Sequence, residues 1–439
     1  MNKPVVAIIG RPNVGKSTLF NRLTGNRQAI VEGEPNVTRD RIYGHVEWLD
    51  REFIIVDTGG IDIGRDEEIK NKAKRQAEFA MEEADLILFI VDARSGLTAL
   101  DEEIVGLLRK KEKKVLQVVN KVDTFNNVEE QIWEFYNTGF GEPVPVSAEH
   151  GKNTGNLLDE VVNNLQFLPV EEADDEEVLD IAIVGRPNVG KSTFVNYLAG
   201  SERVIVSAEP GTTRDAVDTI IEVGENVFRM IDTAGLRRKS RVSEDVEYYS
   251  NLRAIRAIER ADGVLMMIDA SEGVAEQDKK ISGYAHDEGK PIVLALNKWD
   301  LVDKYEDTMD TYRDEVYYQL KFLQYAPVTF MSALKGERIL EVMELLEYVV
   351  DQNNLRVKTG MLNEVIQQAV ELRQPPSKKG RRLKIFYATQ TGVRPPSFVI
   401  FVNDPELMHF AYQRYIENSL RETFGFVGTP IRIKLKKRN

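Results

Sequence analysis

The same eight residues, Gly-Arg-Pro-Asn-Val-Gly-Lys-Ser, occur twice in this chain of 439 residues, at positions 10–17 and 185–192. Each copy fits the pattern G-x-x-x-x-G-K-[ST], in which successive backbone N–H groups surround phosphates, the Lys contacts the outer phosphates and the Ser hydroxyl binds Mg²⁺. The repeat therefore predicts two nucleotide-binding sites in one polypeptide. The residues expected to line the two loops are Gly10, Arg11, Pro12, Asn13, Val14, Gly15, Lys16, Ser17 and Thr18, and Gly185, Arg186, Pro187, Asn188, Val189, Gly190, Lys191, Ser192 and Thr193.

More than the loop is repeated. When the two loops are superposed in sequence, Thr38-Arg39-Asp40 falls on Thr213-Arg214-Asp215, and Asp57-Thr58 falls on Asp232-Thr233. Two later segments pair at slightly larger displacements: Asn120-Lys121-Val122-Asp123 with Asn297-Lys298-Trp299-Asp300, and Ser147-Ala148 with Ser332-Ala333. The common order predicts a duplicated domain, and small insertions in surface loops explain the growing displacement.

Each copy alternates short apolar runs with helical patterns. In the first copy the expected strands are 5–9, 53–56, 86–91, 115–119 and 144–146, and the expected helices include 17–23 and 101–110. Such alternation predicts an α/β fold with a doubly wound, mostly parallel sheet. Ligands bind such sheets at the carboxyl ends of the strands.

Length and pattern together predict three domains, since about 150 residues per domain is usual. We expect α/β domains at 1–168 and 179–351, a linker at 169–178 and a small α+β domain at 352–439. The linker contains six carboxylates in the seven residues 171–177, which favours a self-repelling tether, although a functional acidic segment is an alternative. The C-terminal elements are expected at 361–370 and 405–424 for helices, and at 383–387, 397–402 and 431–435 for strands.

Charge is distributed unevenly. The net charge is −13, but residues 352–439 carry +10 and the remainder −23. In the last predicted strand, Ile431, Ile433 and Leu435 alternate with Arg432, Lys434 and Lys436, so one face is apolar and the other basic. We expect any polyanionic partner to contact this module. Phosphate contacts by Lys378, Lys379, Arg381, Arg382 and residues 432–438 are the hypothesis, and a merely solvated end is the alternative.

Composition excludes several classes of site. The absence of cysteine excludes disulfides, thiolate nucleophiles and Cys-ligated zinc, and the four histidines lack ligand spacing. No apolar run approaches the roughly 20 residues of a membrane helix, and the first apolar run leads directly into the phosphate loop instead of forming a signal sequence. We expect a cytoplasmic protein without membrane contact, and a monomer as the simplest state.

The paired Asp residues after the second strand predict a switch. Asp57 and Asp232 can hold Mg²⁺ through water, and the backbone N–H of Gly60 or Gly235 can approach the γ-phosphate. Thr38 and Thr213 are placed to contribute a hydroxyl to the same ion. Because both segments would bind through the γ-phosphate, its departure would release them together.

The Asn-Lys-x-Asp segments predict recognition of guanine. The carboxylate of Asp123 or Asp300 can accept from N1–H and the amino group together, whereas adenine would leave it unpaired at a cost on the order of 1–3 kcal/mol or more. The remaining contacts follow from the same chemistry. Asn120 and Asn297 can address N7, the stems of Lys121 and Lys298 pack on the ring, and the N–H of Ala148 or Ala333, following Ser147 or Ser332, can recognise O6.

Hydrolysis requires a group that positions water. Ile61 and Leu236 follow Asp-x-x-Gly, at the position where many small GTPases use Gln, and neither hydrocarbon can orient water. A residue supplied in trans or a cation must do so. Asn13 and Asn188 are placed to offer a carbonyl oxygen to a monovalent cation; the alternative is that they only shape the turn. The residues expected to act on the reacting phosphates are Asn13, Lys16, Thr38, Gly60, Asn188, Lys191, Thr213 and Gly235.

With these motifs in view, the chain closely resembles the Der (EngA) family, bacterial GTPases with two tandem Era-like G domains followed by a KH-like domain. The resemblance covers essentially the whole length. Besides the repeated motifs, it rests on Lys384-Ile-Phe-Tyr-Ala-Thr-Gln390, Pro395-Pro-Ser-Phe398 and Phe401-Val-Asn-Asp-Pro405.

The resemblance implies GTP hydrolysis, with Mg²⁺, coupled to maturation of the large ribosomal subunit, and rRNA and the pre-ribosomal particle as partners. It also implies potassium-stimulated hydrolysis with Asn13 and Asn188 as K⁺ ligands. In the leading hypothesis, GTP or GDP sets the domain arrangement that docks on pre-ribosomal RNA. The alternative is a nucleotide-gated binding protein in which one G domain is mainly regulatory or structural.

Two departures from the family pattern stand out. The first copy has Asn36 where the second has Gly211, so the two switches need not behave alike. The C-terminal domain lacks the G-x-x-G loop between two helices that clamps nucleotide backbone in KH domains. Its only match, residues 425–428, is expected to be a turn between the last helix and the last strand.

Overall fold

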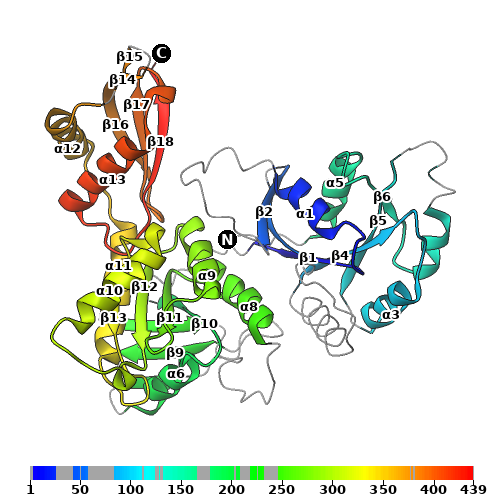
Figure 1. The fold of residues 1–439 in the computed structure, drawn as a ribbon, viewed down its shortest axis with the longest axis horizontal. Coiled ribbons are helices and arrows are strands. Elements are labelled where there is room, and N and C mark those ends of the chain that lie inside the picture. Colours follow the sequence, from blue (N-terminus) through cyan, green and yellow to red (C-terminus); the bar gives the residue numbers. More distant parts are fainter. Residues whose placement is uncertain are drawn as a thin grey trace. The chain divides into compact units, whose positions relative to one another are not determined.

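The structure is a computed structural model, and it describes residues 3–25, 43–49, 51–57, 84–110, 113–123, 128, 132–165, 178–201, 204–207, 218–224, 226–231, 246–375, 377–378 and 381–438 (Figure 1). The chain divides into two compact units, residues 1–172 with 242–252 and residues 173–241 with 253–439. Among the described helices, none has the length and apolar character needed to cross a membrane.

Among the described residues, the first α/β domain contains a six-stranded sheet in the order β2-β3-β1-β4-β5-β6. Its strands are β1 (Val5–Ile9), β2 (Tyr43–Trp48), β3 (Arg51–Asp57), β4 (Leu86–Asp92), β5 (Lys114–Asn120) and β6 (Val144–Pro145). All pairs are parallel except β2 with β3. Both faces are covered, which explains why β1 and β4 are buried along their whole length.

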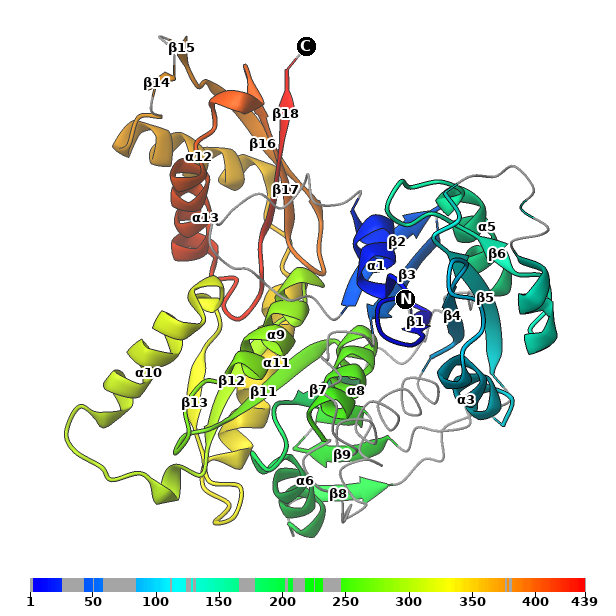
Figure 2. The same ribbon diagram turned by 45° about the vertical axis from the view of Figure 1, so that its right-hand side comes forward.

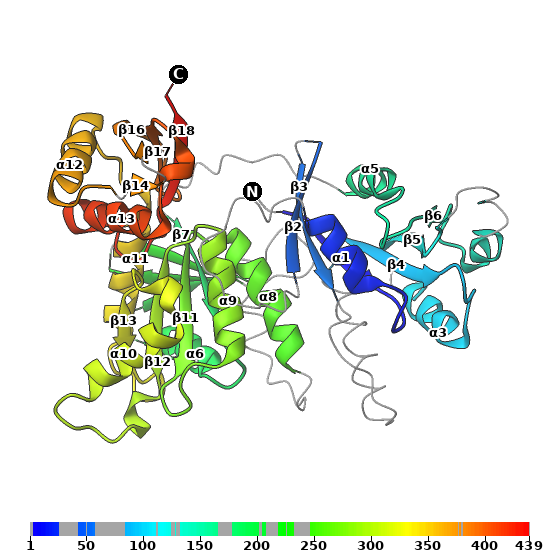
Figure 3. The same cartoon turned by 45° about the horizontal axis from the view of Figure 1, so that its top comes forward.

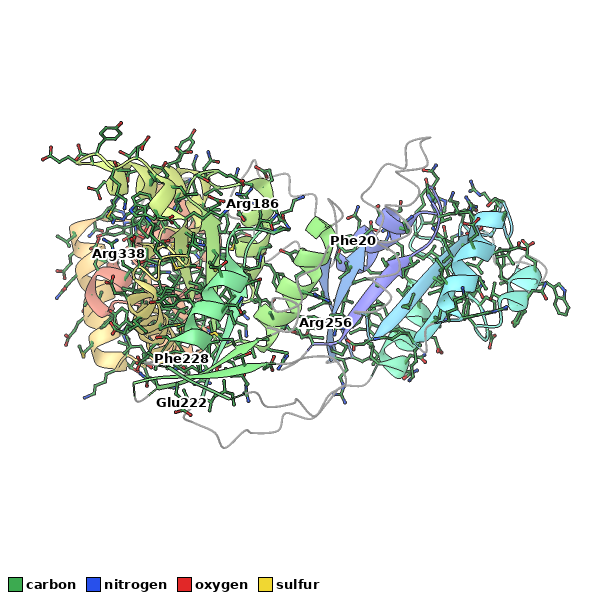
Figure 4. All side chains as sticks on the ribbon, turned by 90° about the horizontal axis from the view of Figure 1, so that it is seen from below. Phe20, Arg186, Glu222, Phe228, Arg256 and Arg338 are labelled. Carbon is green, nitrogen blue, oxygen red and sulfur yellow. The ribbon has the colours of Figure 1, made fainter. Side chains whose placement is uncertain are left out.

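Helices lie on both faces of this sheet. The described helical elements are α1 (Lys16–Thr24), α3 (Ala99–Leu108), α5 (Thr154–Asn164) and the 3₁₀ segment η1 (Trp133–Thr138). Helices α1 and α5 cover one face, and α3 lies on the other (Figure 3). The first face buries Phe20 of α1, labelled in Figure 4, together with Leu157 of α5 and Ile8 of β1.

The described strands of the second α/β domain repeat this frame, in the order β13-β12-β11-β7-β10-β9-β8, and the first-domain residues equivalent to β8 lie outside the described residues. Its strands are β7 (Val178–Val184), β8 (Val204–Ser207), β9 (Thr219–Val223), β10 (Asn226–Ile231), β11 (Gly263–Asp269), β12 (Ile292–Asn297) and β13 (Val328–Phe330). Within this sheet β9 pairs antiparallel with β8 and with β10, and the other pairs of described strands are parallel. The structure therefore confirms two doubly wound, mostly parallel sheets.

The helical elements of the second domain are α6 (Lys191–Gly200), α8 (Val246–Arg260), α9 (Glu276–Asp287), η2 (Trp299–Leu301), α10 (Thr308–Gln319), η3 (Lys321–Leu323) and α11 (Ile339–Asn354). Helices α6 and α11 pack on one face of the sheet, where Phe194 and Leu346 share a core with Phe228 of β10. Phe228 is labelled in Figure 4. Helix α9 contacts the central strands β11 and β12.

The C-terminal module is a small α+β domain, as predicted. It contains α12 (Thr359–Leu372), β14 (Ser377–Lys378), β15 (Arg381–Arg382), β16 (Ile385–Gly392), β17 (Ser397–Val402), η4 (Pro405–Leu407), α13 (Phe410–Phe424) and β18 (Arg432–Lys437). Strands β16-β17-β18 form one sheet, with β17 and β18 parallel. Helices α12 and α13 cover one face of it (Figure 2). Ile433 and Leu435 pack on the core of this module, and Arg432, Lys434 and Lys436 are exposed, which confirms the predicted alternation in β18.

One predicted helix was wrong in extent. The prediction of a continuous helix over 405–424 is replaced by η4 and the separate helix α13, because Met408 and His409 have extended backbone angles. Asp404 caps η4 by accepting from the Glu406 N–H at 3.2 Å. His409 caps α13 by accepting from the Ala411 N–H through Nδ1 at 3.2 Å. A capping side chain that starts a new helix is a local stop signal for the preceding one.

The segment 425–428 is a turn between α13 and β18, as predicted, and it joins the C-terminal module to the second α/β domain. The Gly428 carbonyl accepts from the Ile292 N–H at 2.7 Å, and its N–H donates to the Tyr325 carbonyl at 2.9 Å. Phe426 in the same turn is fully buried. The turn therefore packs against the second α/β domain within the protein. The predicted acidic linker lies largely outside the described residues, and its role stays a prediction.

Candidate nucleotide-binding sites

The two phosphate loops connect the first strand of each domain with the helix that follows. Gly15 and Gly190 begin these helices with φ of 95° and 103°, values that favour glycine. A Cβ on either would lie 2.3 Å from the Asn120 amide nitrogen or 2.2 Å from that of Asn297. The second glycine of each motif thus satisfies a backbone requirement and a close approach together.

The loop lysines lie folded over their own loops. Lys16 Nζ donates to the carbonyls of Gly10 and Arg11, both at 2.8 Å. Lys191 Nζ donates to those of Gly185 and Arg186 at 2.7 and 2.6 Å. Burial lowers the pKa of Lys16, against the opposing effect of Asp57, and burial lowers the pKa of Lys191 to about 8. Phosphate oxygens placed here would restore a partner for each charge.

Two predicted Mg²⁺ ligands lie together in the first domain. Ser17 Oγ donates to Asp57 Oδ2 at 2.7 Å, which joins the start of α1 to the end of β3. Hydroxyl and carboxylate oxygens are the donors that Mg²⁺ accepts alongside water and phosphate, so these two residues fit the ion. Bound there, Mg²⁺ would neutralise charge on the β- and γ-phosphates. The equivalent carboxylate, Asp232, lies outside the described residues.

Asn120 and Asn297 fasten two loops to each other. The Asn120 amide donates to the Val14 carbonyl at 2.8 Å and accepts from the Ala148 N–H at 2.9 Å. Asn297 makes the same pair with Val189 and Ala333, at 2.7 and 2.8 Å. Both are buried. The sequence suggested contacts of these groups with the base, but the structure shows that they also connect the phosphate loop to the Ser-Ala loop.

Two buried aspartates that sequence reasoning missed, Asp92 and Asp269, form ion pairs with the lysine of each Asn-Lys-x-Asp segment. Lys121 Nζ lies 2.7 Å from Asp92 Oδ2 and donates to the Asn13 backbone carbonyl at 2.7 Å. In the second domain, Lys298 Nζ lies 2.5 Å from Asp269 Oδ2. Asp92 and Asp269 end β4 and β11, whose carboxyl ends lie beside those of the strands carrying Asn120 and Asn297. The available signal was that these two aspartates pair at the same displacement as the two Asn-Lys-x-Asp segments.

The two aspartates that are predicted to recognise the base, Asp123 and Asp300, differ in their surroundings. Asp123 accepts from Arg94 through Oδ2 and from Ser147 Oγ through Oδ1 at 2.9 Å. Both hydrogen bonds lower the pKa of the Asp123 carboxyl, and the bond from Arg94 has the larger effect. The Asp300 side chain has no hydrogen bond or ion pair within the described part of the chain. The residue equivalent to Arg94 is Ser271.

A buried carboxylate also holds the arginine of each phosphate loop. Arg11 Nε donates to Asp101 Oδ2, and Arg186 Nε to Asp278 Oδ2, both at 3.0 Å. Both carboxylates are fully buried at the start of α3 or α9, and burial raises the pKa of Asp278. Arg186, labelled in Figure 4, also contacts Glu272 and the Gly273 carbonyl. Sequence reasoning placed Arg11 and Arg186 in the loops but missed these anchors.

The remaining predicted site residues divide into two groups. Asn13 and Asn188 have left-handed backbone angles, with φ of 64° and 63°, and are exposed. The other group, Thr38, Gly60, Thr213, Gly235 and Asp232, together with Asn36, Ile61, Gly211 and Leu236, lies outside the described residues. Within the described part, no group of three or more His, Asp or Glu side chains is arranged to hold a metal ion.

Comparison with known proteins decides the family. A model of the 50S ribosome-binding GTPase family matches residues 5–121 and 180–298, and one described as the KH-domain-like C-terminal part of EngA bacterial GTPase enzymes matches 356–436. The GTPase Der of Halothermothrix orenii is 66% identical over 438 residues, 100% of both chains. The chain belongs to the Der GTPase family.

Other members agree in length as well. The GTPase Der of Moorella thermoacetica is 57% identical over 437 residues, 100% of this chain and 99% of that one. Among solved structures, Aquifex aeolicus Era bound to GDP.AlF4- shares 23% identity, with 60% of this chain and 93% of that chain covered and a TM-score of 0.31. Membership of the Der family makes this chain a GTP-binding GTP hydrolase with two P-loop domains and a KH-like domain.

Proposed function

We propose that this protein hydrolyses GTP at both α/β domains and couples hydrolysis to maturation of the large ribosomal subunit through nucleotide-dependent domain rearrangement. The observation that carries the proposal is the duplicated site, in which each phosphate loop is tied to its own Asn-Lys-x-Asp segment. The match of both domains to the 50S ribosome-binding GTPase family supports the choice of particle.

The roles of the site residues belong to this proposal. Lys16 and Lys191 contact the β- and γ-phosphates, and Ser17 with Asp57 holds Mg²⁺, as Ser192 does with Asp232 in the second domain. Asp123 and Asp300 select guanine. Thr38 and Thr213 bind Mg²⁺ and the backbone N–H groups of Gly60 and Gly235 bind the γ-phosphate, so both segments are released when that phosphate leaves. The protein acts as a monomer in the cytoplasm.

We propose that K⁺ assists hydrolysis through the exposed side chains of Asn13 and Asn188. The Asn13 backbone carbonyl is taken by Lys121, but neither Asn side chain makes a hydrogen bond to any described residue, so both amide oxygens can coordinate a cation. Replacing K⁺ by Na⁺ at equal ionic strength should slow GTP hydrolysis. The double variant Asn13→Ala, Asn188→Ala should hydrolyse GTP equally in both salts. A wild-type rate that is unchanged in Na⁺ would instead point to a residue supplied in trans.

We propose that the C-terminal module contacts rRNA through the face of its sheet opposite α12 and α13. Tyr387 and Phe401 stack there, with ring centroids 4.3 Å apart and an interplanar angle of 14°, and Tyr387 is 42% exposed. Lys434 and Lys436 of β18 lie in register beside Val399 and Phe401. A partly exposed pair of stacked aromatic rings bordered by lysines suits unpaired bases and phosphates.

Cosedimentation tests the assembly role. Large ribosomal subunits should retain the protein in a non-hydrolysable GTP analogue and release it in GDP, or the reverse. Equal retention in the two nucleotides would contradict the proposal. The variant Tyr387→Ala with Lys434→Glu should weaken retention in both states, whereas Lys335→Glu, an exposed change in the second domain, serves as the charge control.

A second candidate is a nucleotide-gated binding protein in which the first domain is mainly regulatory. One observation favours it: the base-recognition carboxylate of that domain is paired with Arg94, and that of the second domain has no such partner among the described residues.

A further inference from the structure

We propose that Arg94 is an internal competitor for guanine in the first α/β domain. Its guanidinium binds the Asp123 carboxylate, the group that selects the base in the proposed function, on which this inference rests. Binding of GTP or GDP at this domain then requires Arg94 to leave. The second domain binds without such an exchange.

The position of Arg94 follows from the end of β4. The Arg94 N–H donates to Asp92 Oδ1 at 2.9 Å, which fixes the backbone of this turn directly after the strand. The guanidinium then reaches Asp123 Oδ2. Because Ser147 Oγ donates to Oδ1 at 2.9 Å, both oxygens of the carboxylate already have donors from the chain itself.

A guanidinium resembles the edge of guanine that Asp123 selects. Both are planar, and both present adjacent N–H donors suited to a carboxylate. Arg94 donates to Oδ2 and Ser147 donates to Oδ1, so the base would need the same carboxylate that the guanidinium already engages. In this proposal the two planar donors compete for that carboxylate, and the observed affinity of the site is reduced by the fraction of molecules in which Arg94 is engaged.

A purely structural role for Arg94 finds little support. Its side chain is 64% exposed, and the described residues give it no other hydrogen-bond acceptor. His150 Nε2, 3.8 Å from Asp123 Oδ1, is the next cation-capable group at this carboxylate. Arg94 thus contributes neither core packing nor a helix cap, and its contact with Asp123 is its defining interaction.

The second domain provides the internal comparison. Ser271 replaces Arg94 and turns back to its own strand end, where its hydroxyl donates to Asp269 Oδ1 at 2.6 Å. It cannot reach across as an arginine does. Asp300 has no ion pair within the described ranges, so guanine meets an uncontested carboxylate there.

The test is a site-resolved GDP titration of the full chain by calorimetry. In an Asp300→Ala background, which leaves only the first site, Arg94→Ser should lower the Kd for GDP by about two- to fivefold, the range that an exposed ion pair commands. In an Asp123→Ala background, the reciprocal Ser271→Arg should raise the Kd of the second site. Lys110→Ser removes a positive charge from an exposed position of the first domain and should leave the Kd unchanged.

An unchanged or higher Kd for Arg94→Ser would overturn the competitor role, because it would mean that the arginine is neutral or assists binding. Failure of the guanine assignment itself looks different. If Asp123→Ala left GDP binding at the first site intact, the proposed function of that carboxylate would be wrong whatever Arg94 does.

Discussion

The two α/β domains share one frame but not one base site. In both, an Asn side chain fastens the phosphate loop to the Ser-Ala loop, and a buried Asp at a strand end holds the following Lys. The hydrogen bonds of the Asn side chains are nearly equal in length, 2.8 and 2.9 Å for Asn120 against 2.7 and 2.8 Å for Asn297. The difference lies at the carboxylate that is proposed to select guanine, since Asp123 is paired with Arg94 and Asp300 lacks a comparable partner in the described chain.

Among the described residues, the buried scaffold of the site is the same in the two domains, and the difference is confined to its exposed edge. Contacts that shape the phosphate loop are buried, so their loss would leave polar groups unpaired. The Arg94 contact is exposed, so Ser at this position costs the fold little. The two sites can therefore differ in affinity without differing in architecture.

Removing the phosphate-loop lysine of either site should have the greatest effect on GTP hydrolysis. Lys16→Ala or Lys191→Ala should lower kcat/KM of its own site by about 100-fold or more, because an aligned charge on the reacting phosphates is lost. Steady-state GTP hydrolysis of each variant then reports the share of the other site. If both variants retained more than half of the wild-type rate, turnover at both sites could not be coupled.

The buried ammonium of Lys191 predicts a pH-dependent stability. Its pKa of about 8 lies below the unfolded value of 10.5, so the unfolded chain binds more protons between these values and stability should rise with pH across that window. Lys191→Met should raise the free energy of unfolding of nucleotide-stripped protein at pH 7 by up to about 3 kcal/mol and abolish this rise. Urea unfolding at pH 7 and pH 9 measures both effects, with Lys335→Met as the exposed control. A destabilised Met variant at pH 7 would contradict the prediction.

The turn that joins the C-terminal module to the second α/β domain depends on Gly428. Gly428 has a φ of 73°, and a Cβ there would lie 2.4 Å from a methyl carbon of Val349 on α11. Gly428→Ala should cost about 2–3 kcal/mol through overpacking and a disfavoured backbone angle. Gly392→Ala, whose Cβ would meet Ser397 only at 3.7 Å, is the matched control in the same module. Thermal unfolding compares the variants, and equal melting temperatures would show that the turn is not under this constraint.

A smaller difference in stability is expected between variants of Asp101 and Asp278, the carboxylates that hold Arg11 and Arg186. Thr98 accepts from the Asp101 N–H at 3.4 Å, so α3 keeps a side-chain cap if Asp101 is truncated, whereas α9 begins after Ala275 and relies on Asp278. Asp278→Ala should therefore destabilise its domain by about 1 kcal/mol more than Asp101→Ala does. Hydrogen exchange of the amides in α3 and α9 resolves the two. Adding Thr98→Ala to Asp101→Ala should remove the difference, and an unchanged difference would exclude the cap as its cause.

Much of this architecture could be predicted from the sequence, because buried parallel strands are marked by continuous apolar runs. Residues 5–9 and 397–402 became strands with the predicted bounds. The edge strand β2 was missed because Tyr43–Trp48 has no continuous apolar run and is only partly buried. The break before α13 was missed because His409 caps the helix only through its extended backbone conformation. The apolar pattern of the neighbouring residues does not indicate that conformation.

The site was predictable where a motif fixes both residue type and spacing. Ser17 and Asp57 are distant in sequence and meet because β1 and β3 are parallel neighbours. Asp92 and Asp101 lie outside the repeated motifs, although each has an Asp counterpart in the second copy. Arg94 could not be predicted, since nothing in the sequence states that its side chain reaches Asp123.

We propose that the chain carries two guanine nucleotide sites and that these sites are not equivalent. Calorimetric titration of the wild-type protein with GDP measures this most directly. We predict two molecules of GDP per chain in two affinity classes, and we predict that Arg94→Ser alone brings the weaker class closer to the stronger. A single GDP per chain, or two identical sites that do not respond to Arg94→Ser, would contradict the claim.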